Sequence, residues 1–221
     1  MDLYDVMRTS FSARDFTDEP VPDDVLHRIL DNARFASSGG NRQGWHVMAV
    51  RDQATRARLV PLIQPAWRRY LAQVRARENP WNTVDAMTVT QADIDAVKIQ
   101  PGFLEGLVEA PVLLLVCVDL KVVASMDSEL DRVGVISGAS IYPFVWNILL
   151  AARNEGFGGT LTTFIAAQEP KLQELLGMPK HVAFAAMIPM GKPVKQLTKL
   201  KRKPVEDFAV FDTWDGPPIS G

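Results

Sequence analysis

Apolar residues recur at helical spacing in several stretches of the chain. The clearest run, Val25 to Ala36, follows Pro20 to Asp24, where prolines and acidic residues are typical of a helix start. The most apolar pattern, Ser128–Glu155, contains Pro143 near its first turn or at a kink and is followed by Gly156, a typical stop. Because it is apolar on several sides, we expect it to be buried centrally or against a second subunit. Further helices are predicted over Asp2–Thr9, Asp52–Ile63 and Glu169–Leu176.

Three apolar runs have the length of buried strands, at His46–Val50, Val112–Asp119 and Val182–Met190. They alternate irregularly with the helices, which favours an α+β or three-layer α/β/α domain over a regular βαβ array. Between Gln64 and Gly106 the pattern weakens, and prolines mix with tryptophans. This stretch is too long for a structureless connection, so we interpret it as short helices that form a cap or lid. Residues 64–106 are called the lid segment below.

The composition is that of an ordinary globular protein of one domain, or at most two small ones. The 221 residues carry a net charge of −2, which gives no electrostatic case for nucleic acid or an anionic membrane. No signal peptide opens the chain, and no apolar stretch reaches membrane-spanning length. The one cysteine, Cys117, lies in an apolar run and cannot form an internal disulfide, which fits a reducing cytoplasm. We therefore expect a cytoplasmic protein that binds neither nucleic acid nor membrane.

Several common catalytic arrangements are missing from the sequence. The three histidines, His27, His46 and His181, have no metal-ligand spacing, and there is no nucleophile elbow, Walker A loop or dinucleotide-binding glycine motif. We therefore predict no catalytic side chain and no metal ligand. If the protein is an enzyme, a bound cofactor is expected to carry the difficult chemical step.

The segment from Phe35 to Trp45 is the best candidate for a ligand-binding loop. It is small, polar and glycine-containing, and it lies between a predicted helix and a predicted strand. Glycines allow positive φ and leave amide groups unshielded, while Ser38, Asn41 and Gln43 add short hydrogen-bonding side chains. Taken alone, the segment is slightly more typical of an ordinary helix-to-strand loop than of a binding loop.

A series of motifs in a fixed order resembles the FMN-dependent nitroreductase family. The resemblance covers nearly the whole chain except the lid segment, and each motif is weak singly but the order and spacing are specific. The motifs are Ser12–Pro22, Ser38–Trp45, Gly138–Ser140, Glu155–Gly159, Gly191–Pro193 and Lys201–Asp207.

The resemblance implies a three-layer α/β/α fold with a mixed, mainly antiparallel central sheet and a C-terminal extension onto a partner subunit. It implies one FMN-binding domain over residues 1–221, with the lid segment as a variable insert. It also implies a homodimer with the flavin sites at the interface, some residues of each site coming from the partner.

By resemblance, FMN is held by Ser12, Arg14, Ser38, Gly39, Asn41, Gln43, Thr162, Thr163 and Arg202. A planar guanidinium such as that of Arg14 suits a phosphate or the flavin carbonyl oxygens. The backbone of Thr162 and Thr163 would approach the flavin N5 and O4, and Arg202, with Lys201 or Lys203, would complete the phosphate site. The alternative for the basic tail is a solvated run of charge.

Two departures from the family pattern concern the phosphate and the loop. Ser10 stands where the family has its first arginine, which leaves Arg8 or the basic tail as candidates to replace that charge. Ser37 and Gly44 stand where the family usually has prolines, without removal of any side-chain donor.

The function implied is an FMN oxidoreductase that takes hydride from NADH or NADPH and passes the electrons to a small aromatic acceptor. Nitroaromatics and quinones are the expected acceptors, which would follow NAD(P)H at the same surface in ping-pong order. One alternative keeps the fold but not the turnover, as a flavin-binding or flavin-consuming protein. Another is an interaction protein whose apolar helix serves only dimerisation.

Overall fold

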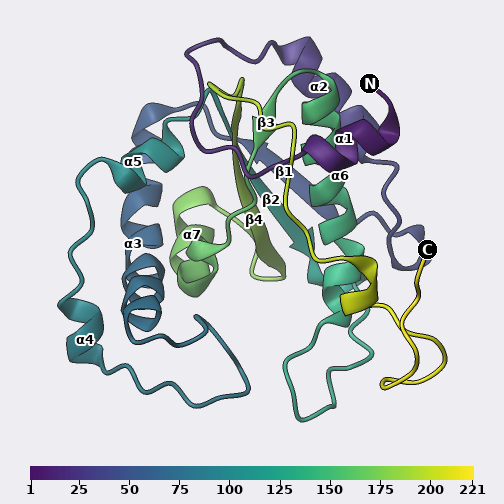
Figure 1. Cartoon of the computed structure of the whole chain (residues 1–221). Helices are drawn as coiled ribbons and strands as arrows, with labels where there is room; N and C mark the ends of the chain where they lie inside the picture. Colours follow the sequence, from purple (N-terminus) through teal and green to yellow (C-terminus); the bar gives the residue numbers. More distant parts are fainter.

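The computed structural model describes residues 1–221 and contains a four-stranded sheet with helices on both faces (Figure 1). The strand order is β1-β2-β4-β3, and every pair is antiparallel. A mixed sheet was expected, but the parallel pairing is limited to an isolated bridge between Ser12 and Gly159. The strands are β1 (Trp45–Ala49), β2 (Val112–Asp119), β3 (Gly158–Gly159) and β4 (Val182–Gly191).

The sheet separates two hydrophobic cores because alternate side chains of a strand point to opposite faces. On β2, Leu114 and Val116 pack with α2 (Asp23–Ala33) and α6 (Tyr142–Asn154). Leu113, Leu115 and Cys117 pack on the other face with the three helices α3 (Gln53–Arg75), α5 (Phe103–Val108) and α7 (Glu169–Leu176). The predicted α+β class with three layers is confirmed, and Figure 1 shows the two helical layers on either side of the strands.

Helix α3 runs much further than the predicted end at Ile63, as far as Arg75, although Pro61 and Pro65 lie inside it. An internal proline costs a helix about 3 kcal/mol. The buried face formed by Leu59, Ile63 and neighbouring residues packs against α5 and the 3₁₀ turn Phe164–Gln168, and this packing offsets the cost. The rest of the lid segment contains the short helix α4 (Gln91–Asp95), with α5 beginning at its end.

Helix α6 begins at Tyr142, so it occupies only the second half of the apolar range Ser128–Glu155. The buried Asp127 carboxylate accepts hydrogen bonds from the backbone of Val135 (2.7 Å) and from Arg132 (2.8 Å), and these bonds fold residues 127–136 into a loop. A 3₁₀ turn, Ile136–Ser140, leads from that loop to the helix. Pro143 lies in the first turn, where a proline is tolerated.

The two ends of the chain run over the same face of the molecule. After α1 (Leu3–Thr9), residues 12–17 lie beside β3 and the segment that follows β4. The tail continues as an extended segment with one 3₁₀ turn, Val205–Asp207. Two further 3₁₀ turns are Gly39–Asn41 and Leu120–Val122. None of the helices combines the length and apolarity required to cross a membrane.

Candidate functional site

Two of the predicted site residues, Ser12 and Arg202, line one cavity of about 170 Å³, called the Ser12 cavity below. It lies where the segment after α1, strand β3, the end of α6 and the C-terminal tail meet. Its polar lining is formed by Ser10, Ser12, Arg153, Gln196 and Arg202 and by the backbone of Gly158 and Gly159. Trp146 and Leu149 of α6 contribute apolar surface.

Close backbone packing forms the wall of this cavity. The amide of Ala13 donates to the carbonyl of Gly159 (3.1 Å), so the N-terminal segment adds to the edge of β3. A Cβ at Gly159 would lie 2.8 Å from the carbonyl oxygen of Pro189, so only glycine fits there. The side chain of Gln196 donates to the carbonyl of Thr9 (3.0 Å) and fastens the tail to the end of α1.

The Ser12 cavity is electrically positive. Arg153 and Arg202 are the ionisable groups that line it, and no carboxylate is among its lining residues. Sequence reasoning missed Arg153, although a signal was present. Seven residues, close to two helical turns, separate it from Trp146, so both lie on the same face of α6.

In the chain, strand β3 is followed directly by Thr160 and Thr162, whose hydroxyls have no hydrogen-bond partner. Both Oγ1 atoms are buried. The backbone of Thr162 is bound to Met187 of β4, with its amide donating (2.9 Å) and its carbonyl accepting (2.8 Å). Thr163 is exposed and precedes the 3₁₀ turn Phe164–Gln168. Buried hydroxyls without partners are suited to a ligand with polar edges.

Arg14 lies beside the cavity but does not line it. Its Nη1 donates to the carbonyl of Ser12 (3.3 Å), and its exposed side chain borders a shallow cleft with Asp15 and Asp18. The guanidinium is therefore close along the chain to Ser12 but faces a different cleft.

The remaining predicted residues form their own structured loop at residues 38–43. Ser38 Oγ accepts from the amide of Gln43 (3.0 Å), and the side chain of Gln43 donates to Asn41 Oδ1 (3.2 Å). Asn41 (φ 53°) and Gln43 (φ 50°) both adopt the left-handed conformation, as does Gly40. Non-glycine residues rarely do so, and such strain is concentrated at functional sites.

Loop 38–43 and the Ser12 cavity lie at opposite ends of α6. The amide of Gly39 donates to Ser140 Oγ (3.1 Å) just before the helix, whereas Arg153 lies in its last turn. A helix of 13 residues is about 20 Å long, so the two groups do not meet within one chain.

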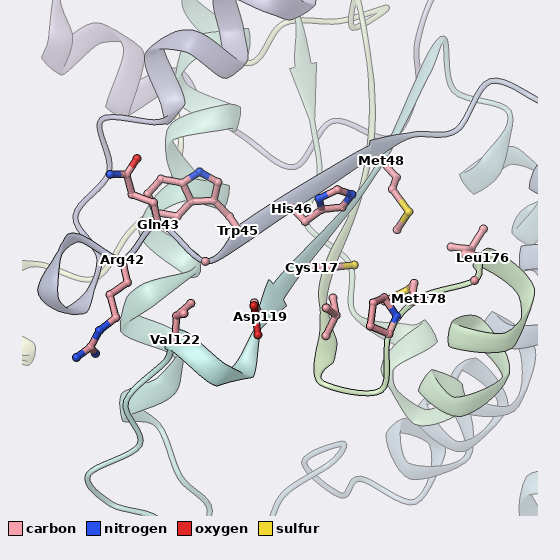
Figure 2. A pocket seen from close by; sticks show the side chains of 14 residues that line it. Arg42, Gln43, Trp45, His46, Met48, Cys117, Asp119, Val122, Leu176 and Met178 are labelled. Carbon is pink, nitrogen blue, oxygen red and sulfur yellow. The ribbon is translucent and has the colours of Figure 1, made fainter.

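A larger cavity of about 480 Å³ opens beside β1 (Figure 2) and contains one predicted site residue, Gln43. His46, Cys117 and Asp119 also line it. Burial raises the pKa of the Cys117 thiol to about 12, so it is protonated and unreactive. No group of three or more histidine, cysteine, aspartate or glutamate side chains is arranged to hold a metal ion. This cavity shows no catalytic arrangement of its own.

Comparison with known proteins identifies the family of the chain. The chain is 26% identical over 212 residues to human iodotyrosine deiodinase 1, covering 95% of this chain and 68% of the human protein. It is 28% identical over 206 residues to an NADH dehydrogenase of Thermus thermophilus, covering 90% of this chain and 91% of that protein.

Among solved structures, oxidized iodotyrosine deiodinase bound to FMN and 3-iodo-L-tyrosine superimposes with a TM-score of 0.68. The identity is 22%, and the match covers 96% of this chain and all of the other. The model of the nitroreductase family matches residues 7–192. The chain therefore belongs to the nitroreductase family.

Proposed function

We propose that the protein is an FMN-dependent oxidoreductase that uses NADH or NADPH to reduce a small aromatic acceptor. The observation that carries the proposal is the positive Ser12 cavity in a chain of the nitroreductase family. The chain leads from the cavity wall at Gly159 directly to Thr160 and Thr162, whose buried hydroxyls have no hydrogen-bond partner. A phosphate needs cations and N–H donors, whereas a flavin ring needs partners for its polar edges.

The residues present fit FMN in two places. Ser12 and Arg202 would hold the phosphate in the Ser12 cavity. The hydroxyls of Thr160 and Thr162 and the backbone of Thr163 would face the ring edge. Arg14 faces a neighbouring cleft, so its exposed side chain would have to turn before its charge lies beside the ring. Whole ligands usually occupy about 300–1,000 Å³, so the cavity of one chain takes only the end of the molecule.

A second copy of the chain would complete the site. Tyr142 and Trp146, one turn apart on α6, are 43% and 45% exposed and form an apolar strip that leads to the Ser12 cavity. The tail also carries exposed aromatic residues at Phe208, Phe211 and Trp214. We infer a two-fold homodimer in which α6 packs against the partner and the tail extends over it. Ser38, Gly39, Asn41 and Gln43 would then reach the flavin of the partner.

Bound FMN supplies the hydride and electron chemistry, and the protein binds, orients and excludes water. No side chain is required as a general acid or base. The Thr162 amide is already bound to Met187, so the backbone donor expected beside the reduced ring is the amide of Thr163. Together with the charge of Arg14, once its exposed side chain has turned towards the ring, it would stabilise the reduced ring electrostatically. The lid segment would cover the surface at which NAD(P)H and the acceptor bind in turn. The single buried thiol supports a cytoplasmic location.

A second candidate function is reductive dehalogenation of an aromatic amino acid, favoured by the similarity to iodotyrosine deiodinases along 95% of this chain. It would use the same flavin site with a different acceptor. A flavin-binding or flavin-consuming protein without turnover remains the alternative outside catalysis.

An absorption spectrum of the purified protein tests the proposal. We expect flavin bands with added FMN and their bleaching by NADH or NADPH in stopped-flow experiments, followed by recovery with a nitroaromatic, a quinone or iodotyrosine. A protein that takes up no FMN would refute the proposal. FMN that binds but is not bleached would favour the binding protein over the reductase.

A further inference from the structure

The side chain of Arg153 is fixed at one end and free at the other. Its Nε donates to Thr9 Oγ1 (2.9 Å), and that hydroxyl donates in turn to the carbonyl of Asp5 (2.6 Å). Nη1 and Nη2 have no hydrogen-bond partner within the chain. The guanidinium is therefore oriented by α1 while its two outer nitrogens remain available, and the residue lines the Ser12 cavity.

The charge of Arg153 is not compensated by a neighbouring acid. Glu155, two residues further on, pairs instead with Arg28 (3.1 Å). Arg34, Arg51 and Arg132 also form ion pairs with carboxylates, whereas Arg153 and Arg202 form none. The cavity is lined by the partly buried Arg153 and the exposed Arg202, neither of which has a carboxylate partner, and by no carboxylate. Such a lining is suited to an oxyanion with several acceptor oxygens.

Neither position 8 nor position 10 of the N-terminal segment adds a charge to the lining of this cavity. The Ser10 hydroxyl donates to the carbonyl of Val6 (2.8 Å) and is turned into α1. Arg8 lies over the ring of Tyr4, at 5.7 Å, and does not line the cavity. Arg153 reaches from α6 to Thr9, the neighbour of Ser10 in the chain.

We propose that Arg153 is the residue that makes this site specific for a phosphorylated flavin, because it supplies from α6 the positive charge that position 10 lacks. The inference rests on the proposed function, since it requires that the chain binds flavin. Arg153 and Arg202 hold the phosphate from two sides, and Ser12 adds a hydroxyl. The ring contacts are made elsewhere, so the loss of Arg153 weakens FMN binding and leaves riboflavin binding unchanged.

The test compares FMN with riboflavin, which has the same ring and ribityl chain but no phosphate. Dissociation constants for both are measured by quenching of flavin fluorescence with the flavin-free full-length protein. Arg153→Gln keeps a hydrogen-bond donor for Thr9 and removes the charge. Because charge-assisted hydrogen bonds are strong, we expect FMN affinity to fall by about tenfold to a hundredfold, while riboflavin affinity stays within about twofold.

Arg8→Gln is the matched control, since it removes a nearby charge outside the cavity and should leave the preference for FMN unchanged. Thermal unfolding of each variant shows whether it folds. If Arg153→Gln does not fold, the same two dissociation constants are measured with Arg153→Met. Retention of the wild-type preference for FMN in the Arg153 variants would overturn the inference. An equal loss of both flavins would also overturn it, by showing that Arg153 only fastens α1 to α6. A wild-type protein that binds neither flavin would refute the proposed function and the inference together, which is a distinguishable result.

Discussion

Arg56 gives the sharpest test of how this fold is held together. It lies in α3, is only 4% exposed and has no carboxylate partner. Its guanidinium donates to three backbone carbonyls, those of Val50 (2.8 Å), Val108 (3.0 Å) and Ala110 (2.8 Å). Burial lowers the pKa of Arg56. The side chain thus joins the end of β1 to the connection from α5 into β2, where the lid segment returns to the sheet.

Replacement of Arg56 by leucine should destabilise the protein substantially. Three buried carbonyl groups would lose this donor, and a buried polar group without a partner costs about 1–3 kcal/mol. Leucine also removes a charge that is expensive to bury, which offsets part of that sum. The loss of the three hydrogen bonds alone would lower the free energy of unfolding by about 3–9 kcal/mol. With the offset from the removed charge, we expect it to fall by about 3–5 kcal/mol. For a chain of this length, that corresponds to a Tm lower by about 6–20 °C.

The assay is urea unfolding followed by circular dichroism at 25 °C and fixed protein concentration. Arg58→Leu is the matched control, because Arg58 is exposed on the same helix and has no hydrogen bond or ion pair. It should change the free energy by less than about 0.5 kcal/mol. The reasoning is refuted if Arg56→Leu costs less than about 1 kcal/mol, or no more than the control.

Three further predictions follow from local environments. Because burial raises the pKa of Cys117 to about 12, a thiol reagent at pH 8 should label it only in urea, and rapid labelling of the native protein would contradict this. Hydrogen bonds led by that from Thr88 lower the pKa of Glu78 from 4.5 to about 2, so its stabilisation is complete above about pH 4.5 and is lost as the pH falls towards 2. The rate of hydrogen exchange in residues 76–90, corrected for the intrinsic exchange rate, should therefore rise in the wild-type protein as the pH is lowered from 5 to about 2.5. The rise should be smaller in Glu78→Gln, and identical pH profiles of the two proteins would exclude this role of Glu78. Gly159→Ala should lower the free energy of unfolding by about 1–3 kcal/mol, because the added Cβ would lie 2.8 Å from a carbonyl oxygen of β4. Gly106→Ala is the control, since a Cβ there would meet no atom within 4 Å, and it should be neutral or stabilising. Equal effects of the two substitutions in urea unfolding would contradict the packing argument.

The sequence alone determined the class of fold, the family and most of the elements. Periodicity located β2 and β4 and the core of α2, because burial of one face imposes a local repeat on the sequence. Motif order identified the family, which the match over residues 7–192 confirms. It also named Ser12 and Arg202, which line one cavity although 190 residues separate them.

Only the tertiary structure decided the length of α3, the start of α6 and the position of Arg153. Helix α3 continues past two prolines because its apolar face packs against distant elements, and propensity cannot register such contacts. The residues before α6 form a loop because Asp127 binds backbone amides eight or more residues away. Arg153 meets Thr9 across 144 positions, so no local pattern could associate it with the N-terminal segment. Helical periodicity is a local property of the chain, whereas a binding cavity depends on which distant segments pack together.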